Sequence, residues 1–120
     1  MNCIIVDDEP NAIDVLKRYA ELTPFLNLRQ TFRNPLKAIS YLQEEQVDLV
    51  FLDINMPKLS GIQFLRSIET KPLVIFTTAY SEYAVESYDL NAVDYLVKPI
   101  EFDRFIKAVN KAGELFNKQI

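Results

Sequence analysis

The chain has 120 residues, of which 49% are hydrophobic and 25% are charged, a balance typical of one globular domain with its own core. Its net charge of −4 argues against binding a nucleic-acid backbone, because such binding requires clustered lysine and arginine. The lack of histidine excludes Ser-His-Asp triads and histidine zinc sites, so any chemistry must rest on carboxylates, hydroxyls and lysine.

Hydrophobic periodicity predicts five strands that alternate with five helices. In chain order we expect a strand at 2–7, a helix over 10–22, a strand at 27–32, a helix over 35–45, a strand at 48–53, a helix over 60–68, a strand at 73–77, a helix over 81–88, a strand at 93–97 and a helix over 101–116. This alternation predicts an α/β fold in which a doubly wound parallel sheet is covered by helices on both faces.

Four of the expected strands end on side chains that suit phosphate chemistry. These side chains are Asp7 and Asp8 after the first strand, Asp53 at the third, Thr78 after the fourth and Lys98 after the fifth. Because the carboxyl ends of parallel strands open on the side where α/β proteins bind ligands, these side chains would share one crevice. Each has an ordinary explanation alone, such as helix capping by the aspartates, and only the combination favours a site.

Aspartates gathered at one edge require a counter-charge, since two ionised carboxylates about 5 Å apart repel by roughly 3 kcal/mol at an effective dielectric constant near 20. Oxygen ligands without histidine or cysteine favour a hard cation such as Mg²⁺. With a metal ion in place, the Asp53 carboxylate could act as a nucleophile and form an aspartyl phosphate. Lys98 and Thr78 could then bind phosphoryl oxygens.

The same residues belong to four sequence motifs. The motifs are Val6-Asp7-Asp8-Glu9, Leu52-Asp53-Ile54-Asn55-Met56-Pro57 with Gly61, Thr77-Thr78-Ala79, and Tyr95-Leu96-Val97-Lys98-Pro99. In this order and spacing they resemble the receiver (CheY-like) domain of bacterial two-component response regulators, over essentially all of residues 1–120. The resemblance implies a flavodoxin-like sheet with strand order 2-1-3-4-5. It also implies that Asp53 accepts a phosphoryl group from a sensor histidine kinase.

A magnesium site is part of what this resemblance implies. Asp8, Asp53 and the main-chain carbonyl of Asn55 would ligate Mg²⁺, and Asp7 would assist through a water molecule. Such a domain catalyses its own phosphorylation and dephosphorylation rather than acting as a conventional enzyme on a separate substrate.

Further residues would respond to the phosphoryl group. The resemblance implies that Lys98 and Thr78 hold its oxygens and that the peptide bond from Lys98 to Pro99 is cis. Thr78 would move toward the new oxygens and Tyr95 would turn inward, which would reshape the surface of the fourth helix, fifth strand and fifth helix. The segment 76–99 is most similar to receivers joined to LytTR-type DNA-binding domains.

Tyrosines near the expected site lead to two hypotheses. A symmetric contact between two phosphorylated copies is expected on a face that carries Tyr83, Tyr88, Asp94 and Tyr95. Asn55 and Tyr80 lie two positions beyond Asp53 and Thr78, where they should flank the path of a hydrolysing water. The bulky Tyr80 should therefore lengthen the life of the acyl phosphate.

Other functions compete with this interpretation. A magnesium-dependent phosphatase of the aspartyl-phosphate type is one, but such enzymes carry a second acid where this chain has Asn55. An FMN-binding module is another, but the acidic run from Asp7 to Glu9 would repel the cofactor's phosphate. Within the family, the chain could be a stand-alone receiver that signals by contact, or the input half of a transcription regulator. DNA would then be bound only by a domain beyond Ile120.

The expected compartment is the cytoplasm. No apolar stretch approaches the ~20 residues that cross a bilayer, so we expect no membrane contact. The start, Met1-Asn2-Cys3-Ile4, lacks the basic region of a signal peptide.

Overall fold

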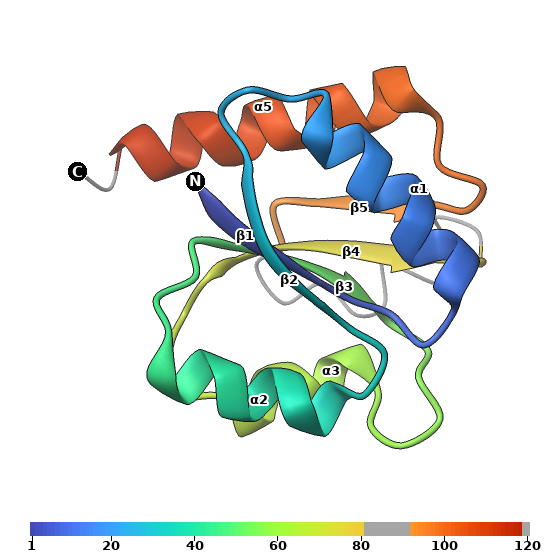
Figure 1. The fold of residues 1–120 in the computed structure, drawn as a ribbon, viewed down its shortest axis with the longest axis vertical. Helices are drawn as coiled ribbons and strands as arrows, with labels where there is room; N and C mark the ends of the chain where they lie inside the picture. The colour runs from blue at the N-terminus through green and yellow to red at the C-terminus, as the bar shows by residue number, and fades with distance from the viewer. Residues whose placement is uncertain (81–91, 119–120) are drawn as a thin grey trace.

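A computed structural model describes residues 1–80 and 92–118 of the chain. The helix predicted over 81–88, which includes Tyr83 and Tyr88, lies outside these described residues. The described part forms an α/β fold in three layers, with a sheet between two pairs of helices (Figure 1).

The five predicted strands form a single parallel sheet. They are β1 (Asn2–Val6), β2 (Asn27–Phe32), β3 (Leu49–Asp53), β4 (Leu73–Thr78) and β5 (Asp94–Val97). Their order across the sheet is β2-β1-β3-β4-β5, and all neighbours are parallel, which confirms the predicted order. The winding reverses beside β1, and sheets of this kind bind ligands at such a switch point, beyond the carboxyl ends of the strands.

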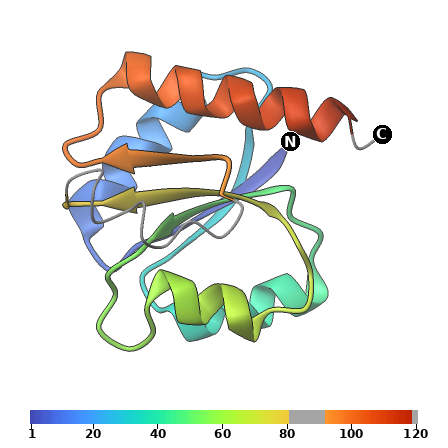
Figure 2. The same cartoon turned by 180° about the vertical axis from the view of Figure 1, so that it is seen from behind.

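In the described part of the chain, four helices cover the two faces of the sheet. The first pair, α1 (Pro10–Glu21) and α5 (Phe102–Lys118), lies on one face, and α2 (Pro35–Glu44) and α3 (Gly61–Ser67) lie on the other (Figure 1). Figure 2 shows the same layers from behind. Each helix begins and ends within two residues of its predicted range. Among the described residues, we find no helix with the length and apolar character that a membrane span requires.

The central strands are buried because helices pack against both of their faces. In β1, Ile5 belongs to the apolar cluster shared with α1 and α5, whereas Ile4 belongs to the cluster shared with α2 and α3. In β3, Phe51 and Leu52 alternate in the same way. This two-sided burial explains the nearly continuous apolar runs in the sequence. It also means that the first polar residues appear where the strands leave the core.

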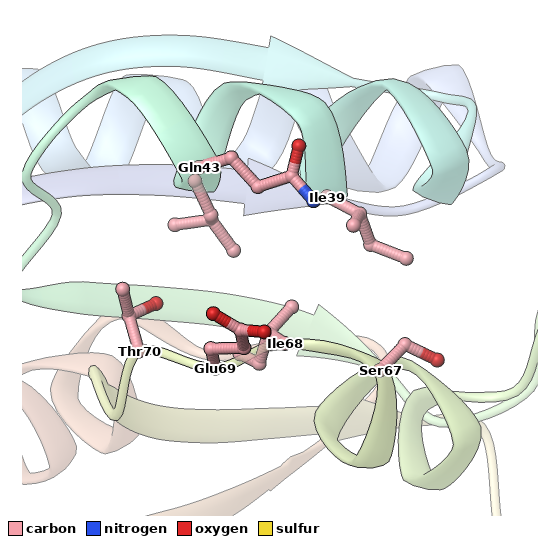
Figure 3. A pocket seen from close by; sticks show the side chains of 7 residues that line it. Ile39, Gln43, Ser67, Ile68, Glu69 and Thr70 are labelled. Carbon is pink, nitrogen blue, oxygen red and sulfur yellow. The ribbon is translucent and has the colours of Figure 1, made fainter.

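A pocket of about 230 Å³ lies between α2 and the segment that follows α3, on the face opposite α1 and α5. Figure 3 shows Ile39 and Gln43 on α2 facing Ile68 and Glu69 across this space. The residues that line the pocket are Ile39, Leu42, Gln43, Ser67, Ile68, Glu69 and Thr70. None of the predicted site residues is among them.

Candidate functional site

Four carboxylates meet at the carboxyl ends of β1 and β3. Asp7, Asp8 and Glu9 directly follow β1, and Asp53 is the last residue of β3. Because the two strands pair in register up to their ends, oxygens from all four acids lie within 4.8 Å of one another. Asp7 and Asp53 are buried, Asp8 is half-buried and Glu9 is exposed.

Lys98 brings an ammonium group to these acids from the end of β5. Its Nζ lies 2.8 Å from Glu9 Oε1, 3.0 Å from Asp7 Oδ2 and 3.7 Å from Asp53 Oδ2. The main-chain N–H of Lys98 donates to the Thr78 carbonyl at 2.7 Å, which ties the lysine to the adjacent strand β4. The peptide bond between Lys98 and Pro99 is cis in the structure.

Glu9 is the site residue that sequence reasoning missed. It is the N-cap of α1, yet its side chain accepts no capping hydrogen bond and instead contacts Lys98. The available signal was its position directly after two aspartates, in a chain where a lysine ends another strand at the same edge.

Burial and neighbouring charge make Asp53 hard to ionise. The pKa of Asp53 is raised from 3.8 to about 7, first by burial and next by the negative charge of Asp7. The ammonium of Lys98 and a hydrogen bond from the Asn55 main-chain N–H to Asp53 Oδ1, at 3.2 Å, act in the opposite direction. Without further positive charge, Asp53 is therefore only partly ionised at neutral pH.

The carboxylates of Glu9 and Asp7 partly neutralise the positive charge of Lys98. Burial lowers the pKa of Lys98, but the hydrogen bond to Glu9 and the nearby negative charge of Asp7 outweigh burial and raise it overall. The buried Asp7 Oδ2 is within 3.0 Å of the ammonium but lacks a hydrogen-bond partner, so the pair is an ion pair with poor hydrogen-bond alignment. One acceptor oxygen in the site thus remains to be satisfied.

This donor set fits a hard divalent cation. It consists only of oxygens, it includes a buried carboxylate oxygen without a hydrogen bond, and it sets four acids against the ammonium of Lys98. Ions such as Mg²⁺ bind through one or two carboxylates plus water and phosphate oxygens, which matches the half-exposed character of the site. Asn55 lies beside these acids, because its main-chain N–H donates a hydrogen bond to Asp53 Oδ1.

Gly61 allows the loop after β3 to close tightly over Asp53. Its N–H donates to the Ile54 carbonyl at 2.8 Å. A Cβ at this position would lie 2.8 Å from the Asp53 carbonyl oxygen, 3.0 Å from the Ile54 Cα and 3.3 Å from a ring carbon of Phe76. Two of these neighbours are main-chain atoms that cannot swing away, so the close approach requires glycine.

Thr78 and Tyr80 lie at the end of β4, next to β3. Thr78 is buried, and its Oγ1 accepts a hydrogen bond from the Tyr80 main-chain N–H at 3.1 Å. Tyr80 is 58% exposed. Asp53 pairs with Thr77 in the register of β3 and β4, which sets Thr78 one step beyond the carboxylate.

Tyr95 on β5 joins the interior to the surface formed by β5 and α5. Its half-buried ring stacks on Phe76, with centroids 5.7 Å apart and an interplanar angle of 12°. Its carbonyl accepts a hydrogen bond from Arg104 Nη2 at 3.0 Å. Phe76 in turn packs beside Gly61 near the site. The aromatic pair therefore spans the distance between the acidic edge and β5.

An ion pair fixes α5 to β5 on the same surface. Arg104 binds both oxygens of Asp94, with Nη1 to Oδ2 at 2.8 Å and Nη2 to Oδ1 at 2.6 Å, and Lys111 Nζ lies 3.2 Å from Oδ2. Burial acts to raise the pKa of Asp94, but the hydrogen bonds from Arg104 outweigh it, and the pKa is lowered overall. Asp94 is thus a well-paired buried acid.

Comparisons with known proteins agree with these features. Residues 3–110 match the response regulator receiver domain family. The positive alginate biosynthesis regulatory protein of Pseudomonas aeruginosa is 39% identical over 117 residues, which cover 94% of this chain and 47% of that protein. The chain spans about half the length of the curated relatives it matches.

Solved structures with similar sequences share the fold. The response regulatory domain of protein MrkE from Klebsiella pneumoniae superposes with a TM-score of 0.86 at 33% identity, covering 98% of this chain and 99% of that one. The response regulator protein TrrA from Thermotoga maritima, in complex with Mg²⁺ and BeF, gives a TM-score of 0.77 at 32% identity, covering 92% and 97%. The acidic edge, its lysine and the sheet order therefore have a common explanation: the chain belongs to the response regulator receiver domain family.

Proposed function

We propose that this receiver domain is a phosphorylation switch in which Asp53 accepts a phosphoryl group from a sensor histidine kinase. The observation that carries the proposal is the meeting of four carboxylates with the Lys98 ammonium at the switch point of the sheet. Asp53 at this place has a carboxylate beside the Lys98 ammonium and next to the half-buried Asp8 and the exposed Glu9. These are the requirements for nucleophilic attack on phosphorus.

The transfer step uses the Asp53 carboxylate as nucleophile. One oxygen forms a bond to phosphorus while the bond from phosphorus to the donor atom breaks, and the donor leaves with that electron pair. When bound, Mg²⁺ supplies the positive charge that keeps the acids ionised and offsets the charge of the phosphoryl group. Asp8, Asp53 and the Asn55 carbonyl would hold it, with Asp7 acting through water. The TrrA structure, which is a complex with Mg²⁺ and BeF, supports magnesium binding at this domain by analogy.

Lys98 and Thr78 bind the product in this proposal. The Lys98 ammonium pairs with one phosphoryl oxygen, and the Thr78 hydroxyl donates to another, because the aspartyl phosphate brings new acceptor oxygens. Thr78 Oγ1 already accepts from the Tyr80 N–H, so its own proton is available for donation. The domain thereby promotes its own phosphorylation and, with water as acceptor, its dephosphorylation.

The switch then reaches the surface formed by β5 and α5, which follow the segment where the sequence predicts a helix over 81–88. Movement of Thr78 toward the phosphoryl group makes room for Tyr95, whose stack on Phe76 already links the two regions. The expected result is a symmetric dimer through this face, of which Asp94 and Tyr95 are the described members. Sedimentation with Mg²⁺ and beryllofluoride tests this, and a monomer at high concentration under these conditions would contradict it.

We further propose that the protein acts in the cytoplasm and regulates transcription through a LytTR-type DNA-binding domain outside residues 1–120. The support is that relatives of about twice the length include the alginate regulator of Pseudomonas aeruginosa. A stand-alone receiver that signals by protein contact is the alternative. Sequencing the open reading frame past Ile120 separates the two.

The phosphoacceptor is tested directly by incubation with acetyl phosphate and Mg²⁺, followed by intact-mass measurement. We expect the mass of one phosphoryl group on the wild-type chain and no gain for Asp53→Asn. Chelation of Mg²⁺ should abolish the gain. Equal gain in the two chains would contradict Asp53 as the acceptor.

A further inference from the structure

Glu9 forms a hydrogen bond with the ammonium group of Lys98, which the proposed phosphoryl transfer requires. Lys98 donates a hydrogen bond to Glu9 Oε1 at 2.8 Å, whereas Asp53 Oδ2 stands 3.7 Å from the same nitrogen. The longer separation is beyond hydrogen-bond distance. The amine is therefore held toward Glu9 and Asp7, and its contact with the acceptor carboxylate is only an ion pair.

The local backbone leaves the Glu9 side chain available for this contact. Its main-chain N–H donates to Asp7 Oδ1 at 2.9 Å, which holds the turn between β1 and α1. The side chain makes no capping hydrogen bond to α1 and is 59% exposed. Packing and capping therefore do not depend on the Glu9 carboxylate, and its described interaction is with Lys98.

We propose that Glu9 is a positioning residue that tethers Lys98 in the unphosphorylated domain and so slows formation of the aspartyl phosphate. The inference rests on the proposed function of Asp53. Phosphoryl oxygens that arrive at Asp53 must compete with Glu9 for the N–H groups of Lys98. The negative charge of Glu9 also repels them, because it lies within the same cluster of acids.

The substitution Glu9→Gln tests this role, since it keeps the shape of the side chain and removes the charge. We expect phosphorylation by acetyl phosphate to be about two- to five-fold faster than in the wild type, the size expected when an exposed ion pair is lost. In this reaction an Asp53 oxygen bonds to phosphorus as the phosphorus–oxygen bond to acetate breaks and acetate leaves. The Mg²⁺ concentration is set to saturate each variant separately.

Asp14→Asn is the matched control. Asp14 is exposed on α1, forms no salt bridge with another described residue, and its replacement changes the net charge by the same amount. We expect this variant to react at the wild-type rate. The effect of Glu9 is then assigned to its charge and contact with Lys98 at the site and not to the overall charge of the domain.

Affinity for beryllofluoride at saturating Mg²⁺, measured by calorimetry, gives a second readout that needs no phosphoryl transfer. We expect Glu9→Gln to bind it about two- to five-fold more tightly than the wild type does, and Asp14→Asn to match the wild type. Wild-type behaviour of Glu9→Gln in both assays, or equal acceleration by Asp14→Asn, would overturn the tether. A wild-type chain that gains no phosphoryl mass would overturn the proposed function, and the tether with it.

Discussion

Removal of the Asp53 charge should stabilise the metal-free domain at neutral and alkaline pH. The folded chain holds Asp53 with a pKa of about 7, against 3.8 for an unperturbed aspartate, so the folded state binds more protons than the unfolded state between these values. The contribution of Asp53 to stability is therefore full below about pH 4 and is lost as the pH rises to about 7. An asparagine removes this loss and keeps an oxygen for the Asn55 N–H.

The size of the effect follows from the pKa shift. A rise from 3.8 to about 7 corresponds to on the order of 4 kcal/mol at pH 8 and on the order of 2 kcal/mol at pH 5. We expect Asp53→Asn to raise the free energy of unfolding by amounts of this order, because the net pKa shift already includes the attraction between Asp53 and Lys98.

Urea unfolding followed by far-ultraviolet circular dichroism measures this difference, with a chelator present at pH 5 and pH 8. Asp14→Asn serves as the control, because it removes an exposed charge, and it should change stability little at either pH. Saturating Mg²⁺ should stabilise the wild type and narrow its gap to Asp53→Asn, since the ion binds only the folded site. A gain that is equal at both pH values, or a loss at pH 8, would refute the role assigned to burial and charge at Asp53.

Three further predictions concern the surroundings of the site. Gly61→Ala should destabilise the fold by about 1–3 kcal/mol in thermal or urea unfolding, because its Cβ would meet main-chain atoms at 2.8 and 3.0 Å. The control is Gly113→Ala in α5, whose Cβ would lie 3.8 Å from its nearest neighbour, a ring carbon of Phe25. This substitution should stabilise the fold by up to about 1 kcal/mol. A similar loss of stability in both variants would contradict the close contact at Gly61. Tyr80→Ala should shorten the life of the aspartyl phosphate in a decay assay, and unchanged decay would remove the shielding role. Arg104→Ala should lower stability by about 1–3 kcal/mol at pH 7 because it leaves buried Asp94 with a weaker partner. Since the pKa of Asp94 is lowered in the folded state, this loss should shrink as the pH falls below about 4, and a pH-independent loss would argue against the ion pair.

The fold was predictable because the hydrophobic pattern of each segment agrees with the strand or helix that the segment forms in the folded chain. Apolar runs such as Ile4–Val6 and Leu49–Leu52 are long enough for strands and short enough to exclude helices, and helical periodicity separates them. The polar residue that ends each run then marks the edge where the site lies. Asp53, Thr78 and Lys98 could be singled out on this basis alone.

Contacts between residues distant in the chain could not be read in the same way. Glu9 and Lys98 are separated by 89 positions, and no periodicity indicates that their side chains meet. The same is true of the stack of Tyr95 on Phe76 and of the bidentate pair of Arg104 with Asp94. Side-chain direction and reach across the sheet decide these contacts.

The sequence by itself determined the alternation of strands and helices and the chemical nature of the strand tips, because burial on two faces dictates which residues are apolar. Only the tertiary structure decided how charge is distributed at the edge: which acid holds Lys98, which carboxylate oxygen lacks a hydrogen bond, and how far the pKa of Asp53 rises. The physical reason is that these properties depend on distances of a few ångströms and on shared burial, which arise only when the carboxyl ends of β1, β3 and β5 meet at one edge of the folded sheet.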